Sequence, residues 1–281
     1  LDAPTESARA LRRAYLRTDY NDDYLDPGQA TCDALAGQNR GSTQYAERPR
    51  YGFYCGSDRS IGYGTILSKR RGVNGYASLN YAFDNGTQWF ADVQMGYHDI
   101  ALMRDVTQWG LMAADGNEDG YFHNQATDQV EFWQRQFSPE EMGGLRNGMI
   151  RSTQKTFSVT TGFKGSLGPN WDYEASLSHS QYQSSIRWPQ IIASKANALF
   201  LGEQLGEYTD DDDNVFPVFN ADPARLYRPL SRSEYDSIAA KTTYTPKSRT
   251  DTAALTLTNG ELFELPGGKA GFAATAEFGN Q

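Results

Sequence analysis

A period of two in apolar and polar residues runs through residues 74–98. Odd positions from Gly75 to Phe83 are mainly apolar, and the alternation resumes after Asp84-Asn85-Gly86 with Trp89, Ala91, Val93, Met95 and Tyr97 on one face and Gln88, Asp92, Gln94, Gly96 and His98 on the other. This period is that of a β-strand with unlike faces, so the segment predicts a β-hairpin. Phe83 and Thr87 share a face only across a three-residue loop, in which Gly86 is free to adopt the left-handed conformation.

Two later segments repeat this design. Residues 153–183 carry a second apolar face, interrupted by Gly168-Pro169-Asn170 and formed by Phe157, Val159, Thr161, Phe163, Trp171, Tyr173, Ala175 and Leu177. Residues 250–279 carry a third, interrupted by Leu265-Pro266-Gly267-Gly268 and formed by Ala253, Leu255, Leu257, Ala270, Phe272, Ala274, Ala276 and Phe278. The pattern predicts an all-β fold of antiparallel hairpins over residues 74–98, 153–183 and 250–279.

Aromatic residues bracket the apolar face of the first hairpin. Trp89 and Tyr97 lie at its two ends, and the path between them is roughly 26 Å at the usual rise of a strand. At a tilt of about 40° this path covers some 20 Å, close to the height of the apolar band of an outer-membrane barrel. The three apolar faces carry no charged residue over 89–97, 157–163 and 171–177. The alternative is an ordinary sandwich strand with one solvated face.

Short turns and long excursions alternate along the chain. The excursions over residues 99–152 and 184–248 are roughly 55 and 65 residues long, whereas most connections in a compact soluble domain have only a few residues. Short turns on one side and long loops on the other are typical of outer-membrane barrels. We therefore expect residues 1–72 to be a long loop or rim region, and residues 73–281 to be part of a transmembrane β-barrel with long extracellular loops.

Composition narrows the function classes. The 281 residues carry a net charge of −9, which argues against a protein that binds a phosphate backbone, and we expect no nucleic-acid partner. No run approaches 18 apolar residues, so the sequence predicts no transmembrane helix. The chain begins at Leu1 and shows no signal peptide, which indicates a processed chain or a piece of a longer one.

The two cysteines, Cys32 and Cys55, lie 23 residues apart in a polar region rich in Gly and Tyr. An even pair in a chain with no other cysteine indicates a disulfide bond formed in an oxidising compartment. Two buried free thiols are the alternative.

Candidate metal and catalytic residues are few. Residues 115–120 match the opening of a calcium loop, but the twelfth position is Ala126 instead of the bidentate Glu that such a loop needs. The acidic run 210–213 is more typical of a solvated loop than of a cation site. His98-Asp99 and Ser178-His179-Ser180 show no nucleophile elbow and no triad spacing. We expect no metal, no cofactor and no enzymatic activity.

Tryptophans in the two excursions are the candidate ligand-binding residues. An exposed indole can stack on a sugar or on an aromatic ligand, and the alternative for each is that it packs one loop against another. The candidates are Trp109, Trp133 and Trp188.

The third hairpin resembles the barrel of TonB-dependent receptors of the outer membrane of Gram-negative bacteria. The resemblance rests on residues 260–268, Gly271-Phe272-Ala273, Ala276-Glu277-Phe278 and residues 249–257, and it extends over 74–281. It implies a barrel of about 22 strands plugged by an N-terminal domain. It further implies capture of a siderophore, vitamin or oligosaccharide at the outer face, with energy from the TonB complex and with outer-membrane lipid around the barrel.

Parts of such a receptor do not occur in these residues. The sequence contains no plug domain, no TonB box and no C-terminal strand ending in an aromatic residue. We therefore expect an internal barrel fragment. A soluble β-sandwich that binds carbohydrate is the alternative; it accounts for the alternation and the aromatic residues, but not for two very long loops or for the aromatic residues that bracket the apolar face.

Overall fold

The computed structural model describes residues 11–59, 63–104, 106–111 and 120–281. The chain divides into two compact units, each assembled from three separate segments. Unit 1 comprises Leu1–Ser68, Leu102–Ile150 and Trp188–Thr242, and unit 2 comprises Lys69–Ala101, Arg151–Arg187 and Thr243–Gln281. The fold is mostly β with predominantly antiparallel pairing, as the alternation in the sequence predicts.

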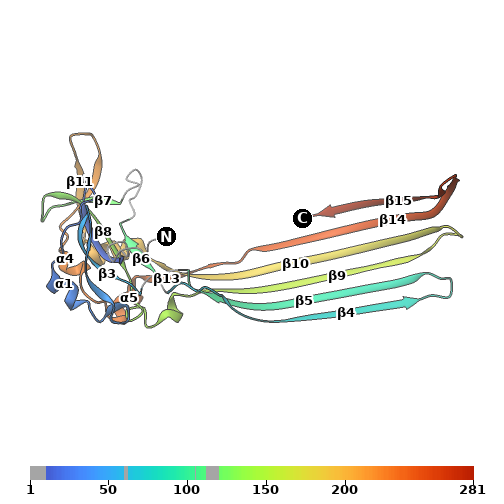
Figure 1. Ribbon diagram of the computed structural model, residues 1–281, viewed down its shortest axis with the longest axis horizontal. Helices are drawn as coiled ribbons and strands as arrows, with labels where there is room; N and C mark the ends of the chain where they lie inside the picture. The colour runs from blue at the N-terminus through green and yellow to red at the C-terminus, as the bar shows by residue number, and fades with distance from the viewer. Residues whose placement is uncertain (1–10, 60–62, 105, 112–119) are drawn as a thin grey trace. The chain divides into compact units, whose positions relative to one another are not determined.

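Unit 2 is built on one open antiparallel sheet (Figure 1). Its strand order is β15-β14-β10-β9-β5-β4, with the short β13 paired to β10. The bounds are β4 Lys69–Ala82, β5 Gln88–Leu102, β9 Ile150–Ser166, β10 Trp171–Ile191, β13 Ala239–Tyr244, β14 Lys247–Leu265 and β15 Gly268–Asn280. The three predicted hairpins are all present, and most of their strands extend a few residues beyond the predicted limits.

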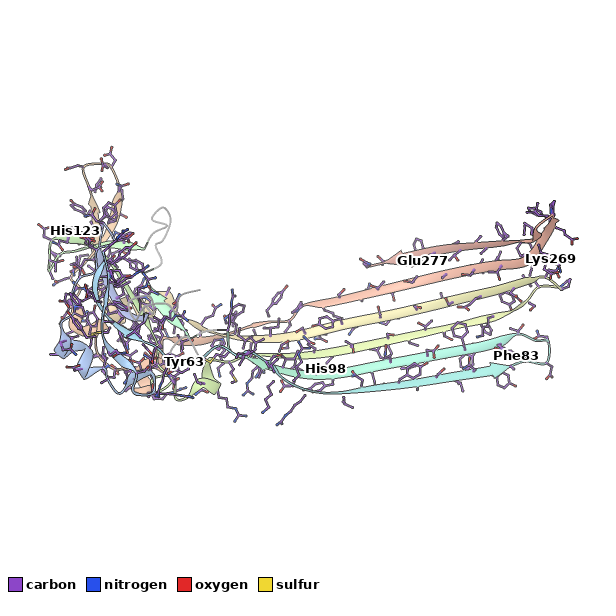
Figure 2. All side chains as sticks on the ribbon, in the orientation of Figure 1. Tyr63, Phe83, His98, His123, Lys269 and Glu277 are labelled. Carbon is purple, nitrogen blue, oxygen red and sulfur yellow. A yellow bond between two sulfur atoms is a disulfide. The ribbon has the colours of Figure 1, made fainter. Side chains whose placement is uncertain are left out.

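The turns follow the parity argument. The Phe83 N–H donates to the Thr87 carbonyl at 2.8 Å, and Gly86 has φ +83°. In the second hairpin the Leu167 N–H donates to the Trp171 carbonyl at 2.7 Å. Both loops therefore hold three residues, as predicted. The third turn is tighter, because Leu265 pairs directly with Gly268. Figure 2 shows Phe83 and Lys269 at the turn ends of the first and third hairpins.

Strand β14 contains an irregularity that does not change its faces. Asn259 pairs with Phe272 and Phe263 pairs with Ala270, so β14 advances four residues while β15 advances two. The Asn259 side chain accepts a hydrogen bond from the Glu261 N–H at 2.8 Å within this bulge. Because the surplus is an even number of residues, apolar positions before and after the bulge remain on the same face.

Unit 1 contains a mixed sheet and several short helices. The sheet order is β11-β12-β7-β8-β1-β3-β2, with β6 paired to β8, and β12 runs parallel to β7. The strands are β1 Arg12–Asp19, β2 Thr43–Arg48, β3 Gly52–Ser57, β6 Gln108–Gly110, β7 Tyr121–Asn124, β8 Gln129–Gln136, β11 Gln204–Thr209 and β12 Val215–Phe219. The helices are α1 Gln29–Ala34, α2 Gln38–Gly41, the 3-10 helix η3 Leu145–Gly148, α3 Ala193–Phe200, α4 Pro223–Leu226 and α5 Arg232–Ile238.

The segments that the sequence predicts as long loops share one hydrophobic core. Tyr15, Trp133 and Phe200 come from the three different segments of unit 1, and all are fully buried in the same cluster. Strand β1 is buried on both faces, because Tyr15 joins this core and Leu16 joins a second cluster with Tyr24 and Tyr54. A strand buried on both faces shows no alternation, so the sequence pattern does not reveal it. In the described part of the chain, no helix is long and apolar enough to cross a membrane.

Strand β8 carries charged residues into the core of unit 1. Arg135 is fully buried and pairs with Glu141, whose exposed fraction is 1%. The guanidinium also donates to the Leu226 carbonyl at 3.1 Å. Glu141 in turn accepts backbone N–H groups from Ser138 and Leu230 at 2.9 Å each. One buried ion pair thus fixes backbone from two segments that are far apart in the sequence.

Glu131 forms the second buried charge centre on the same face of β8. Its carboxylate accepts two hydrogen bonds from Arg17 of β1, at 3.1 and 2.8 Å. It also accepts the Trp133 indole N–H at 2.6 Å and the Thr127 hydroxyl at 2.6 Å. These donors and the Arg17 charge offset the desolvation of the carboxylate and hold the pKa of Glu131 below its usual value.

Helix α5 begins with a complete capping box. The Ser231 hydroxyl accepts the Glu234 N–H, and the Glu234 carboxylate accepts the Ser231 N–H at 2.8 Å. Arg228 donates to the same carboxylate at 2.5 Å. The hydrogen bond from Arg228, followed by those from Ser231, lowers the pKa of Glu234 to about 2. The box fixes the start of a helix that buries Tyr235 and Ile238.

Removing one partner of the buried pair is expected to destabilise unit 1. Glu141→Ala leaves the Arg135 guanidinium buried and unpaired, which costs about 3–5 kcal/mol. Hydrogen exchange of the β8 amides measures the free energy of opening. The matched control is Arg232→Ala, which breaks the exposed Arg232–Asp236 pair and should cost less than about 1 kcal/mol. Equal losses of opening free energy in the two variants would show that the buried pair contributes no more to the stability of unit 1 than an exposed pair does.

The capping box should make the start of α5 sensitive to acid. The pKa of Glu234 is lower in the folded state than its ordinary value of 4.5. The stability that the ionised carboxylate contributes is therefore complete above pH 4.5 and is lost as the pH falls towards 2. Glu234→Gln should lower the stability of α5 by about 1 kcal/mol at neutral pH and flatten this acid dependence. Hydrogen exchange of the α5 amides between pH 4.5 and pH 2 measures this acid dependence. Asp236→Asn, which removes a carboxylate outside the box, should leave the acid transition in place.

Candidate functional site

The pairing of unit 2 places its apolar positions on one continuous face. Ala175 lies opposite Phe163 on one side and Leu255 on the other, and Leu255 lies opposite Ala276. Directly paired residues share a face, so the odd positions of β9, β10 and β14 and the even positions of β15 point the same way. The indole N–H of Trp89 donates to the Thr161 hydroxyl at 2.9 Å, which ties the odd face of the first hairpin to that of the second.

The side chains of this apolar face are exposed. Leu79 is 55% exposed, Leu177 is 62% exposed and Phe278 is 78% exposed. The large core residues of the described chain belong almost entirely to unit 1. Soluble monomers rarely expose contiguous apolar patches of more than a few hundred Å². An exposed apolar face of this kind is typical of a surface that another apolar layer covers.

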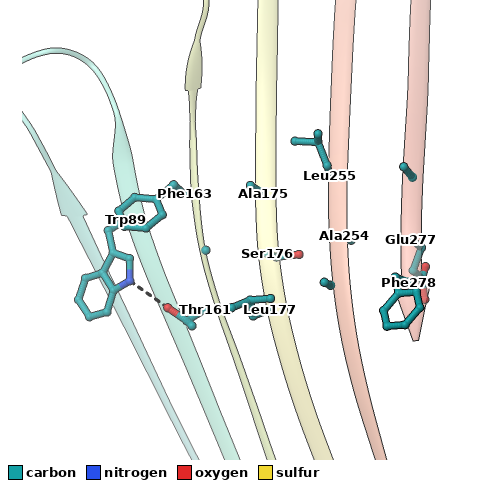
Figure 3. Close-up of a pocket in the computed structure, with 13 residues that line it drawn as sticks. Trp89, Thr161, Phe163, Ala175, Ser176, Leu177, Ala254, Leu255, Glu277 and Phe278 are labelled. Atoms are coloured by element: carbon teal, nitrogen blue, oxygen red, sulfur yellow. Dashed lines mark hydrogen bonds between the residues drawn. The ribbon is translucent and has the colours of Figure 1, made fainter. Parts of the chain in front are cut away.

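The centre of the apolar face forms an open hollow of about 560 Å³ (Figure 3). Small residues such as Ala175, Ala253 and Ala276 line it together with larger ones, including Trp89, Phe163 and Phe278. The Trp89 N–H is bonded to Thr161, and the Thr161 hydroxyl donates to the Phe90 carbonyl at 2.9 Å. These polar groups are satisfied within the sheet, so the surface suits hydrocarbon better than a ligand that needs hydrogen bonds.

The opposite face of the sheet carries cross-strand hydrogen bonds between polar side chains. The Tyr76 hydroxyl donates to Asp92 at 2.6 Å, and the hydroxyl groups of Thr160 and Ser178 lie 2.9 Å apart. Further pairs lie at 3.0 Å (Thr256 and Thr275) and 2.9 Å (Asn74 and His98). The two faces of unit 2 therefore differ sharply in chemistry, as the sequence predicts.

A hydrogen bond between two side chains marks one limit of the apolar face. His179 Nδ1 lies 2.6 Å from Asp251 Oδ1, across the β10–β14 pair. The sequence gives no signal for this contact, because its members are 72 residues apart and the pairing of β10 with β14 is not predicted. Ser178 and Ser180 lie on the other face of β10, so the run Ser178-His179-Ser180 does not bring a hydroxyl to the imidazole.

The three candidate tryptophans occupy different environments in unit 1. Trp133 is fully buried and donates to Glu131, so it is a core residue and offers no ring face to a ligand. Trp109 is 3% exposed, donates to Asn197 at 2.8 Å and packs against Phe200. Trp188 is 43% exposed. Trp133 is therefore a core residue, whereas the nearly buried Trp109 and the exposed Trp188 both line one hollow of unit 1 and stay candidates.

Trp188 borders a hollow of about 760 Å³ in unit 1. Its lining is formed by Arg104, residues 106–111, Gly148, Ile150, residues 188–191 and Ala193. The volume lies within the range of small-molecule sites. An exposed indole beside amide and guanidinium groups can stack on a planar or sugar ring and donate hydrogen bonds to it.

Cys32 of α1 and Cys55 of β3 form a disulfide bond, the pairing that the sequence indicates. Their Cα atoms are 5.3 Å apart. Both residues are fully buried in the main cluster of unit 1. The bond links helix α1 to the sheet, since β3 pairs with both β1 and β2.

The acidic and histidine candidates form no metal centre in the described residues. The calcium-loop candidate 115–120 lies, apart from Gly120, outside the described residues. In the run 210–213 the Asp210 carboxylate accepts backbone N–H groups from Asp212 and Asn214, so it shapes the turn between β11 and β12. Across the described ranges, no group of three His, Cys, Asp or Glu side chains could hold a metal ion.

Comparison of the chain with family models, with curated proteins and with solved structures found no match.

Thiol labelling tests the disulfide. In urea without reductant, a maleimide reagent should label neither Cys32 nor Cys55, because their sulfur atoms are bonded to each other. After reduction under the same conditions, both should react. Intact mass counts the labels, and urea removes the protection that burial alone would give. Ready labelling without reductant would mean that the two thiols are free.

Proposed function

We propose that unit 2 is part of the lipid-facing wall of an outer-membrane β-barrel, and that the intact protein is a TonB-dependent receptor for a scarce nutrient. The observation that carries the proposal is the exposed apolar face that extends over all three hairpins, opposite a face of hydrogen-bonded polar groups. A barrel wall in the outer membrane needs this arrangement, with lipid outside and a wet interior. The proposal assigns no catalytic step.

The length of the apolar face supports this function. Val73 pairs with Tyr97, and Tyr81 pairs with Trp89, so the first hairpin has apolar positions over eight residues of rise. At the usual rise and tilt these span some 20 Å, close to the apolar band of an outer membrane. Aromatic residues lie at both ends of the span, where barrel girdles occur.

The open edges of the sheet imply further strands. β4 and β15 each have a neighbour on one side only, so each exposes a row of backbone N–H and C=O groups on the other. In a bilayer every such group requires a partner, and closure of the barrel supplies it. The proposal therefore includes additional strands beside β4 and β15, in a barrel of about 22 strands.

Unit 1 supplies the candidate surface for the nutrient. Two segments of unit 1 connect the strand ends that lie away from the short turns, and the first segment leads into β4. In the proposed topology those strand ends are extracellular. The hollow beside Trp188 is the candidate contact for a siderophore, a vitamin or an oligosaccharide. Energy coupling through TonB would use parts of the receptor that lie outside these residues.

Membrane fractionation and the mass of the native chain test the receptor proposal together. The native protein should sediment with the outer membrane and resist extraction by urea and carbonate. Its intact mass should correspond to a chain several hundred residues longer than this one, and the additional residues should include a plug-sized domain. A native chain that is released by urea, or that has no further barrel strands, would defeat the proposal and favour a soluble carbohydrate-binding β-sandwich.

Arginine substitutions test which face of the sheet meets lipid. Val93→Arg or Leu177→Arg places a charge on the apolar face, and each should cost about 2–4 kcal/mol when the full chain folds into lipid vesicles. Gln94→Arg is the matched control, because it lies next to Val93 on the polar face and should cost little. Urea titration of vesicle-folded protein gives the free energies. Equal costs for Val93→Arg and Gln94→Arg would reject the assignment of faces.

A further inference from the structure

We propose that a row of basic side chains at the edge of the apolar face binds the anionic headgroups of phosphorylated lipids. We call it the basic row; its members are Lys69, Arg71, Arg151, Lys155, Arg187, Lys247 and Arg249. The inference rests on the proposed function, since it names the chemistry of the lipid that surrounds the barrel wall. It concerns the headgroup and not the hydrocarbon that the apolar face itself requires.

Strand register places the basic row on the apolar side of the sheet. Arg71 lies two residues before Val73 on β4, and Lys155 lies two residues before Phe157 on β9, so each basic residue points to the same face as its apolar neighbour. On β14, Arg249 follows the parity of Ala253 and lies opposite Gln181 of β10. Pairing is regular over these stretches, so the parity is kept. A step of two residues is about 7 Å, and on β4 and β9 the face changes from apolar to cationic within that distance.

The two faces of the sheet carry unequal charge in the part of the strands that holds the basic row. The opposite face carries only Arg70 as a basic residue over 69–73, 150–156, 180–187 and 247–250. On the apolar side of the sheet, the seven basic residues of the row are accompanied by two acidic residues, Asp99 and Asp251. Asp251 already contacts His179. This side is therefore strongly cationic in a chain whose net charge is −9.

The cations of the basic row are available to a ligand. All seven side chains are exposed, and none takes part in an ion pair with another residue in the described ranges. Arg151 and Arg187 lie directly opposite each other across the β9–β10 pair. Like charges in this arrangement repel, and an anion between them removes the repulsion. Guanidinium groups bind phosphate through two parallel hydrogen bonds, which suits this pair.

The adjacent surface indicates a lipid and not a soluble phosphate. A hollow of about 500 Å³ crosses the limit of the apolar face, lined by Leu177, Ala253 and Phe278 on one side and by His179, Asp251 and Asn280 on the other. The basic row does not line this hollow, but Arg249 lies two residues from Asp251 on β14. A lipid whose hydrocarbon chain lies along the apolar part would therefore place its headgroup beside the basic row. Basic residues beside an apolar anchor bind anionic lipid surfaces by the same combination of forces.

Native mass spectrometry of the full chain in detergent tests the proposal. The probes are lipid A and phosphatidylglycerol as anionic lipids and phosphatidylcholine as the zwitterionic reference. The wild-type chain should retain the anionic lipids in preference to phosphatidylcholine. The variant Arg71→Gln/Lys155→Gln/Arg249→Gln should lose about fivefold in affinity for each charge removed, or on the order of 100-fold in total.

A matched control removes the same charge elsewhere. Arg146→Gln/Lys164→Gln/Lys195→Gln changes two exposed cations of unit 1 and one of the polar face of unit 2, and it should retain anionic lipid as the wild type does. Excess inorganic phosphate should not displace the lipid. Equal loss in the two triple variants, displacement by phosphate, or no preference in the wild type would each overturn the proposal.

The failure of this inference is distinguishable from the failure of the proposed function. A chain that folds into vesicles with the expected cost for Val93→Arg, but shows no preference for anionic lipid, overturns the basic row alone. A chain that does not enter vesicles of any composition overturns the barrel wall, and the basic row with it.

Discussion

The buried pairing of Arg135 with Glu141 is the constraint on which unit 1 depends. A guanidinium with no exposed surface needs a carboxylate and further acceptors, or it would cost several kcal/mol. Glu141 and the Leu226 carbonyl supply them, and Glu141 also binds the Leu230 N–H. The aromatic rings of Tyr15, Phe137 and Phe200 surround the same guanidinium. A single cation therefore joins all three chain segments of unit 1 in one core.

Unit 2 satisfies a different constraint. A sheet buries one face against another layer of structure in ordinary domains, but the six long strands of unit 2 have an exposed apolar face. Their polar face is stabilised by short hydrogen bonds between neighbouring strands, such as Tyr76 with Asp92. In the proposed function, lipid is the missing layer that covers exposed residues such as Leu177 and Phe278.

The proposed function rests on the chemistry along the strands. The apolar face suits hydrocarbon, the basic row suits anionic headgroups, and the segments of unit 1 leave a hollow beside Trp188 where a small molecule fits. The apolar face and the basic row occupy successive parts of the strands of unit 2, and the hollow belongs to unit 1. The proposed function uses these three surfaces together, because a receptor in the outer membrane must remain in the bilayer while its extracellular part meets the nutrient.

The sequence by itself determined the hairpins of unit 2. Alternation with period two is a local property. It predicts the two faces of each hairpin and the three-residue loops between Phe83 and Thr87 and between Leu167 and Trp171. The disulfide between Cys32 and Cys55 is indicated by the cysteine count alone. Only the tertiary structure decided unit 1. Its strands are short or buried on both faces, and its contacts join residues more than 80 positions apart, such as Trp109 with Asn197.

The same distinction applies to the candidate surfaces. Trp109, Trp133 and Trp188 are alike in the sequence, yet Trp133 lies wholly in the core, whereas the nearly buried Trp109 and the exposed Trp188 border the same hollow. Pairing of His179 with Asp251 depends on the neighbours of β10, which local pattern does not specify. The basic row depends on parity, which the sequence contains, and on the order of the strands, which it does not. Local periodicity fixes which way a side chain points, and tertiary pairing decides what lies beside it.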